Sequence, residues 1–300
     1  MIISAPENIS DFLKSRDSFL IVKDKKTEFR VLDKDPRHIS FDGSFKLMTI
    51  SAKGIANLSN YYNQIGLLQV YYRFLGTQSI EDDIFLLHGS AAISNNGRTV
   101  LFGDSGRSIG KTLSSMELAR LSSQYIADEF VFFDINSFEI FSDDNIPIHA
   151  RQKTVDHFAK EHGMVITNEF FDKQELGWKF IKKAGLDLIV YVNFSEGKEG
   201  LEELSTDIAA KYAMVTLSAH LEKMLNPSLD RFQFDSQKDM VNMDNSQFEK
   251  ARQKVIFDRL SSRLKDASLK IGHNIPSFEL SVKTPCSVPL YIDTITSKNR

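Results

Sequence analysis

The chain is poor in cysteine and tryptophan, with one of each among 300 residues, and it has neither a long hydrophobic run nor an excess of one charge. The single thiol, Cys286, excludes an internal disulfide, and on this count we also expect no cysteine-based zinc site. Apolar runs such as Leu186–Val192 end well before the roughly 18 residues that a membrane-spanning helix needs. With 37 basic and 40 acidic residues, the chain lacks the bulk positive charge that would hold nucleic acid.

What is present is typical of a globular protein, because 42% of the residues are hydrophobic and 26% are charged. The first residues, MIISAPENISDFLKS, contain no basic segment followed by an apolar stretch, so we expect no signal peptide. We therefore expect a cytoplasmic protein with neither a membrane nor a nucleic acid as partner. No repeat or linker stands out, and we expect one domain over 1–300, divided into N-terminal strands and helix (1–80), core (84–194) and C-terminal helices with an edge strand (195–300).

Hydrophobic periodicity predicts the elements around this core. The expected strands are 19–22, 28–32, 45–50, 187–194 and an edge strand 275–282 that includes Pro276; the expected helices are 58–75, 205–225 and 248–267, with a strand or turn and then a helix in 146–163. The polar segment 226–245 is a candidate lid or insertion.

The core alternates strands with a helix. Strand 85–87 is expected to lead into His88-Gly89-Ser90, after which 91–94 returns as a second strand, followed by a hairpin turn at 95–97. A buried strand 99–102, a glycine-rich loop, a helix 111–122 and a strand 125–133 that contains Asp128-Glu129 come next. This order predicts an α/β fold with a mixed sheet flanked by helices.

The loop TVLFGDSGRSIGKT has the strand–loop–helix context of a phosphate-binding loop. Glycines let successive backbone N–H groups face an anion, and the helix N-terminus adds partial positive charge. Lys111 would reach the β- and γ-phosphates, and Thr112 would place its hydroxyl on Mg²⁺. The usual spacing needs glycine at position 105, where this chain has serine, so we interpret the loop as lengthened by two residues near Arg107-Ser108.

The predicted cradle comprises Gly103, Ser105, Gly106, Arg107, Ser108, Ile109, Gly110, Lys111 and Thr112. The alternative is a glycine-containing turn between strand and helix that binds nothing. The added residues either bulge away from the phosphates or carry Arg107 toward them, and the sequence leaves both open.

His88-Gly89, the hairpin, the loop and the strand Tyr-Ile-Ala-Asp-Glu together resemble the core of the HPr kinase/phosphorylase family and its wider group of small kinases, which share an architecture with phosphoenolpyruvate carboxykinase. The spacings from Lys111 to Asp128 and from His88 to the first loop glycine match that family, and the segment 275–280 resembles its Val-Pro-x-x-x-Leu strand. The loop is longer here, the second acid is Glu129 rather than aspartate, and the family's second glycine-rich signature is not found.

The resemblance implies a kinase of the same P-loop fold that acts on another hydroxyl, with ATP and Mg²⁺ as cofactors and a possible homo-oligomer. Following the family's acid pair, Asp128 would be the catalytic base and Glu129 would support the metal beside Thr112. His88 would hydrogen-bond the base or the γ-phosphate. The alternatives are that the acids only cap a strand in a solvated turn and that His88 is structural.

Four other features have ordinary explanations. Arg151 could reach a phosphate, but a surface arginine fits as well. Phe170-Phe171 and Trp178 are expected to pack in the core or a lid. His157 and His162 are five residues apart, which does not place them on one helical face for a metal.

The function expected from these features is ATP- and Mg²⁺-dependent transfer of a phosphoryl group to a hydroxyl of a small molecule or of a seryl residue in a peptide or protein. The alternative is a nucleotide-binding regulatory module without transfer activity, motivated by the lengthened loop. A P-loop ATPase that drives conformational change is disfavoured, because no arginine finger or helicase signature can be identified. The acceptor stays open.

Overall fold

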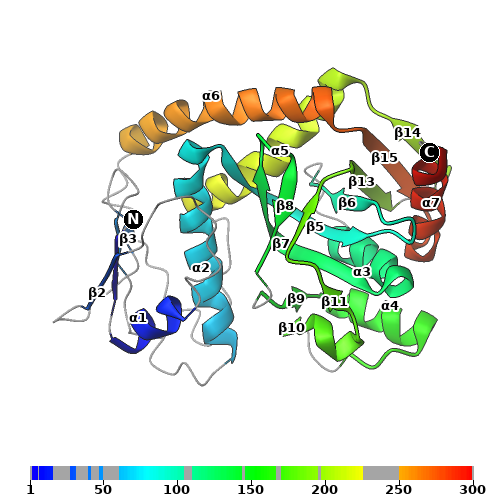
Figure 1. Ribbon diagram of the computed structural model, residues 1–300, viewed down its shortest axis with the longest axis horizontal. Helices are drawn as coiled ribbons and strands as arrows, with labels where there is room; N and C mark the ends of the chain where they lie inside the picture. The colour runs from blue at the N-terminus through cyan, green and yellow to red at the C-terminus, as the bar shows by residue number, and fades with distance from the viewer. Residues whose placement is uncertain are drawn as a thin grey trace. The chain divides into compact units, whose positions relative to one another are not determined.

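A computed structural model describes residues 2–5, 7–15, 28–31, 40–41, 47–49, 61–104, 110–143, 146–166, 170–194, 197–225 and 250–298 (Figure 1). The strand expected at 19–22, the loop residues 105–109 and the candidate lid 226–245 lie outside these described residues.

The described chain contains strands and helices in mixed order. The strands are β1 (Ile2–Ala5), β2 (Glu28–Val31), β3 (Ser40–Phe41), β4 (Leu47–Thr49), β5 (Ile84–Ile93), β6 (Thr99–Phe102), β7 (Gln124–Asp134), β8 (Glu139–Phe141), β9 (Ile148–His149), β10 (Phe170–Phe171), β11 (Lys179–Phe180), β12 (Lys183–Gly185), β13 (Leu188–Phe194), β14 (Gly200–Glu203) and β15 (Ser277–Val282). The α-helices are α1 (Glu7–Lys14), α2 (Tyr61–Ser79), α3 (Lys111–Ser122), α4 (Gln152–His162), α5 (Thr206–Leu225), α6 (Lys250–Asn274) and α7 (Val288–Lys298), and the short 3₁₀ helices are η2 (Ile80–Asp82), η3 (Lys173–Leu176) and η5 (Pro285–Ser287).

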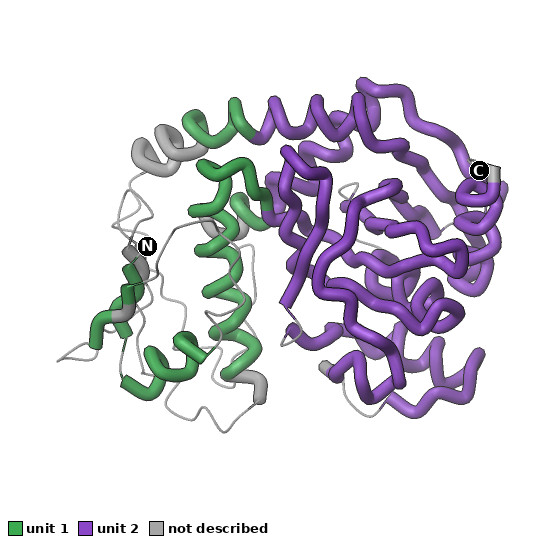
Figure 2. Tube along the Cα trace, viewed as in Figure 1, with its two compact units in different colours: residues 1–85, 220–263 green, residues 86–219, 264–300 purple. Residues whose placement is uncertain are grey.

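Contacts divide the chain into two compact units, and each is assembled from separate stretches of sequence (Figure 2). Unit 1 holds residues 1–85 and 220–263, and unit 2 holds residues 86–219 and 264–300. The sequence pattern instead predicted three consecutive parts of one domain. The three boundaries between the units fall inside β5, α5 and α6 rather than in linkers. That the whole chain acts as one kinase domain stays a prediction.

Unit 1 contains a four-stranded sheet in the order β2-β1-β4-β3. β1 runs parallel to β2 and to β4, while β3 is antiparallel to β4. Helix α1 buries Ile9 and Leu13, and the Ser10 hydroxyl donates to the Ala5 carbonyl at 3.1 Å. The helix expected at 58–75 corresponds to α2. In the part of the chain that the structure describes, no helix combines the length and apolarity needed to cross a membrane.

Unit 2 is built around a larger sheet in the order β12-β8-β7-β5-β6-β13-β15-β14, with β11 paired to β7. Parallel pairing of β6 with β13 and of β13 with β15 is combined with antiparallel hairpins. Along β13 the side chains alternate between two layers: Val190 and Val192 join the core that includes α3, α4 and α7, whereas Tyr191 packs edge-on against Tyr212 of α5. The expected α/β class with a mixed sheet flanked by helices is confirmed.

The hairpin before the loop is confirmed, but its first arm is one strand rather than two. β5 runs unbroken through His88-Gly89-Ser90, and Ser90–Ile93 pair with Thr99–Phe102 in antiparallel register. Glycine fits here because a Cβ at Gly89 would lie 2.8 Å from Cδ1 of Leu101 and 3.0 Å from the Phe102 carbonyl oxygen. The glycine therefore marks close packing against the neighbouring strand and not a break in β5.

The C-terminal strand is also placed differently from the prediction. β15 is not an edge strand, because β13 pairs with one side of it and β14 with the other. Pro276 precedes the strand, so its missing N–H does not interrupt either ladder. The short β14 was not predicted, since Gly200–Glu203 carries little hydrophobic alternation.

Candidate functional site: the N-terminus of helix α3

Helix α3 begins at Lys111, as the sequence pattern predicts, and it follows β6 across the glycine-rich loop. Gly110 caps the helix with φ of 89°, a left-handed conformation that favours glycine, and its carbonyl accepts the Ser114 N–H at 2.8 Å. A Cβ at Gly110 would lie 1.9 Å from Cε2 of Phe194. Both the backbone angle and the lack of space therefore require glycine immediately before Lys111.

Lys111 lies against a buried acid at the end of β6. Its Nζ is 3.2 Å from Oδ2 of Asp104, and the same oxygen is 2.8 Å from Nδ1 of His88 on β5. The Asp104 backbone is fixed to α5, because its N–H donates to the Thr216 hydroxyl at 3.1 Å. All three side chains are largely buried, with 12% of Lys111, 6% of Asp104 and 13% of His88 exposed. Asp104 thus holds the lysine and the histidine at one point.

Thr112 reaches a second buried acid, on β7. Its hydroxyl donates to Oδ1 of Asp128 at 2.8 Å, and the backbone N–H of His149 donates to Oδ2 at 2.9 Å. Burial raises the pKa of Asp128 above its ordinary value, and the nearby Glu129 carboxylate adds to this increase. The two hydrogen bonds and the nearby His149 lower this pKa, but the effect of burial outweighs them. Asp128 is therefore a carboxylate whose charge would be stabilised by a cation.

The residue after Asp128 has an unusual backbone conformation. Glu129 lies within β7 with φ of 62°, in the left-handed region that costs a non-glycine residue roughly 1–2 kcal/mol. Such residues are concentrated at functional sites, where the surrounding structure fixes them. Here the distortion lies next to the acid that Thr112 contacts.

These side chains are of the types that can hold a magnesium ion and a phosphate group. The Thr112 hydroxyl and the Asp128 carboxylate are hard oxygen donors of the type that Mg²⁺ prefers, and they meet at the N-terminus of α3. Lys111 and the positive end of the helix dipole favour phosphate at the same place. The donor set therefore suits both Mg²⁺ and a polyphosphate.

The predicted site residues are distributed as follows. The structure brings together His88, Lys111, Thr112 and Asp128 near the start of α3, with Gly110 as the helix cap. The predicted cradle residues Ser105, Gly106, Arg107, Ser108 and Ile109 lie outside the described residues, so their roles stay predictions.

Gly103 and Asp104 are the two described residues that follow β6 at the start of the loop. Gly103 is packed tightly, because a Cβ there would lie 2.6 Å from Cε1 of Tyr191. Asp104 was not among the predicted site residues. The available signal was an acid directly after the first glycine of the predicted loop, seven residues before Lys111.

The features with ordinary explanations divide into two groups. Arg151 is exposed at the start of α4, as expected for a surface arginine. Phe171 and Trp178 are buried, and Trp178 stacks on Tyr125 with ring centroids 5.6 Å apart, so both are core residues.

The five-residue spacing of His157 and His162 did not predict that the two side chains would share one partner. Both point their Nε2 atoms at Oε1 of Glu117, at 2.7 and 2.8 Å. His162 is the last residue of α4, followed by the capping residue Gly163. Because His162 lies at the end of α4 and the long Glu117 side chain extends from α3, the two histidines can contact one oxygen although they lie on different faces of α4.

Neither the protein-family models nor the curated proteins contain a match to this chain.

Proposed function

We propose that the chain is an ATP- and Mg²⁺-dependent kinase that transfers the γ-phosphate of ATP to a hydroxyl group of a small molecule or of a seryl residue in a peptide or protein. The observation that carries the proposal is the meeting of Lys111 and Thr112 with two buried acids, Asp104 and Asp128, at the start of α3. A strand-capping role for Asp128 explains this less well, because the acid is buried and bonded to the loop threonine rather than solvated.

Each side chain has a role in this proposal. Lys111 neutralises charge on the β- and γ-phosphates, and Asp104 holds the lysine and His88 in position. Thr112 and Glu129 would hold Mg²⁺, which supplies neutralisation of the phosphate charge that develops during transfer. The base is Asp128, whose raised pKa makes it a better proton acceptor than an ordinary aspartate. His88 hydrogen-bonds to the phosphate or to the base.

The test compares Asp128→Asn with a control on the same strand, Asp134→Asn. Asp134 lies at the far end of β7, where its carboxylate accepts turn N–H groups that an amide oxygen can also accept. Binding of ATP with Mg²⁺ is measured by calorimetry, and transfer is measured as ADP formation with a library of hydroxyl compounds and seryl peptides. We expect Asp128→Asn to lower transfer roughly 100- to 10,000-fold, the contribution of a general base, and Asp134→Asn to leave it unchanged.

Three outcomes would count against the proposal. Undiminished transfer by Asp128→Asn would eliminate this residue as the base. Tight ATP binding without transfer to any acceptor would favour the regulatory module. Absence of ATP binding by the wild-type chain would overturn the assignment of the α3 N-terminus as a nucleotide site.

A further inference from the structure

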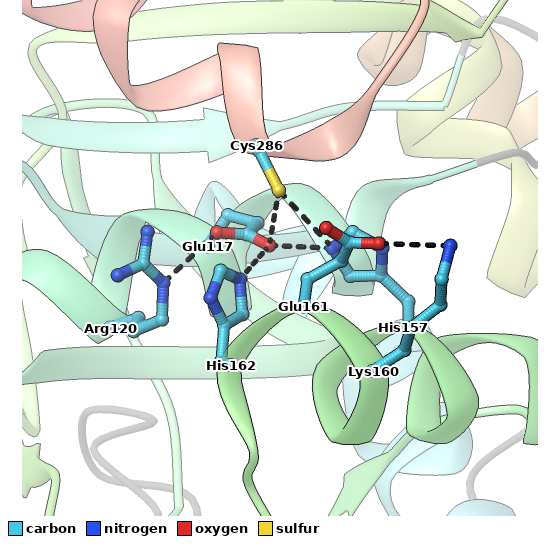
Figure 3. Close-up of polar contacts among 7 residues, drawn as sticks. All are labelled: Glu117, Arg120, His157, Lys160, Glu161, His162 and Cys286. Carbon is cyan, nitrogen blue, oxygen red and sulfur yellow. Dashed lines mark hydrogen bonds and ion pairs between the residues drawn. The ribbon is translucent and has the colours of Figure 1, made fainter.

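A second cluster of polar side chains surrounds the middle of α3. Glu117 of α3, His157 and His162 of α4 and Cys286 of η5 place one ligand atom each within 4.8 Å of one another (Figure 3). The four residues are brought from three elements that are far apart in the sequence, and the Glu117 carboxylate is fully buried. None of them belongs to the site at the helix N-terminus.

The atoms involved distinguish this cluster from a catalytic triad. A triad needs a histidine that bonds the acid through one ring nitrogen and the nucleophile through the other. Here the Nε2 atom of His157 faces both Glu117 and Cys286, and Nε2 of His162 faces the same carboxylate oxygen. The thiol lies 3.8 Å from that oxygen and 3.9 Å from Nε2 of His157. Four electron-pair donors therefore converge on one point, as the ligands of a metal ion do.

The second oxygen of Glu117 is already engaged. Arg120, one turn along α3, donates from Nε to Oε2 at 3.1 Å. This leaves Oε1, the atom that both histidines face, as the ligand for an ion. In established metal sites, hydrogen-bond donors such as this arginine orient the carboxylate that binds the metal.

The ligand set selects among metals. One thiolate, two imidazoles and one carboxylate suit a borderline ion such as Zn²⁺, whereas Mg²⁺ and Ca²⁺ prefer oxygen ligands alone. In a tetrahedral zinc site, bond lengths of 2.0–2.3 Å place the ligand atoms about 3.3–3.6 Å apart. The hydrogen-bonded pairs of ligand atoms lie 2.7–3.9 Å apart and all four atoms lie within 4.8 Å of one another, which brackets the separations that a bound zinc ion requires.

We propose that Glu117, His157, His162 and Cys286 form a tetrahedral zinc site. Four protein ligands leave no open position, which is the pattern of a structural rather than a catalytic zinc. The ion would tie α3 to α4 and to the segment that leads into α7, and it would fix the helix whose first turn carries Lys111 and Thr112. The proposal is independent of the proposed kinase activity.

The test uses the full chain purified under reducing conditions and supplied with Zn²⁺ or Co²⁺. Zinc content is measured by elemental analysis after dialysis, and we expect one ion per chain. Cobalt is expected to give the strong visible bands of tetrahedral coordination together with a thiolate-to-cobalt charge-transfer band. The spectrum reports the thiol ligand directly, so the wild-type chain alone can support or overturn the proposal.

Variants locate the site. Cys286→Ser should abolish the charge-transfer band, and His162→Gln should weaken zinc binding roughly 100-fold or more, since even outer partners contribute 10- to 100-fold. His273→Gln, at an exposed position near the end of α6, is the matched control and should bind zinc normally. Absence of zinc retention, an octahedral cobalt spectrum, or binding unchanged in Cys286→Ser and His162→Gln would show that the cluster is a hydrogen-bonded ion-pair network only.

Discussion

Two buried acids close to helix α3, one beside its start and one in its middle, lie in opposite electrostatic environments. At the start of α3, Asp128 accepts hydrogen bonds from two neutral donors, the Thr112 hydroxyl and the His149 backbone N–H, and burial raises the pKa of its carboxyl group. In the middle of α3, burial would likewise raise the pKa of Glu117, but hydrogen bonds from His162, His157 and Arg120 hold that pKa below its ordinary value. Among the residues that the structure describes, no cationic group is seen to donate a hydrogen bond to Asp128, whereas Glu117 is surrounded by groups that can carry positive charge.

This difference separates two uses of a buried carboxylate. An acid whose pKa is raised can accept a proton or be stabilised by an added cation, which suits a site that binds a charged ligand. An acid that is already paired with cationic side chains contributes to stability through those pairs. Alternatively, the acid and its partners can bind a metal ion together, in which case the partners lose their protons. Proximity along the sequence, from Lys111 to Glu117, therefore does not imply a shared role.

The largest effect should come from removing the charge at the start of the helix. Lys111→Met should lower phosphoryl transfer roughly 100- to 1,000-fold, comparable to the loss of one preorganised electrostatic donor at a transition state. Lys153→Met, an exposed lysine on α4, is the control and should have no effect. This prediction is checked by measuring ADP formation with Mg²⁺ and ATP. Equal activity of both variants would show that Lys111 at the start of α3 has no role in the reaction.

The next largest effect concerns stability. Glu117→Gln, assayed with a chelator so that no metal contributes, should lower the free energy of unfolding by about 2–3 kcal/mol, because it removes a buried acceptor shared by two histidines and an arginine. Glu161→Gln removes an ion pair with Lys160 on the surface, and it should change stability by at most about 0.5 kcal/mol. Chemical denaturation measures both, and similar values would mean that the buried cluster contributes no more than a surface pair.

A pH profile tests the raised pKa of Asp128. A base must be deprotonated to act, so transfer should decline as pH falls through the pKa of Asp128 in the folded chain, which lies above the ordinary aspartate value of 3.8. The acid limb of kcat/KM should therefore lie at higher pH than an unperturbed aspartate would give. Asp134→Asn should keep this limb, and Asp128→Asn should lose it in whatever transfer remains. An acid limb at the ordinary aspartate pKa would contradict the predicted environment.

The smallest expected effect is on stability, and it compares backbone strain beside Asp128 with backbone strain at the far end of α3. Glu129 and Ser123 both adopt left-handed backbone conformations, with φ of 62° and 58°. Replacement of either by glycine should relieve the conformational cost and raise stability by up to about 1 kcal/mol. Only Glu129→Gly should also lower phosphoryl transfer, since Ser123 lies exposed at the far end of α3. Thermal unfolding combined with the transfer assay distinguishes the two, and a destabilising Glu129→Gly would show that its side chain matters more than its backbone.

Much of the framework around the start of α3 could be predicted from sequence, because it depends on local signals. Strong β formers specify β6, and the glycine cap followed by a helical segment specifies α3 to the residue. The hairpin turn at 95–97 follows from Asn-Asn-Gly. Asp128 could be singled out only through the family spacing, because an acid after an apolar strand is otherwise unremarkable.

The rest depends on contacts between distant segments. The convergence of His157 and His162 on Glu117 requires knowledge of how α4 packs on α3, since residues five apart on an ideal helix differ by about 140° in direction. Cys286 lies about 125 residues further along the chain than His162, and no local sequence pattern predicts that the two residues meet. Similarly, the inner position of β15 is decided by β14, which has almost no hydrophobic signature. A count of cysteines could not reveal a mixed ligand set.

The interleaved make-up of the two units has a practical consequence for dissecting the protein. A fragment that ended at residue 219 would keep all the described residues of the candidate site at the start of α3. It would nevertheless remove β15, which pairs with β13, and α7, which packs against α3. Deletion of the C-terminal residues should therefore abolish folding of the region that contains α3, which ends nearly 100 residues before the cut. Neither unit can be produced as one contiguous fragment, because each is made of two separate stretches of sequence.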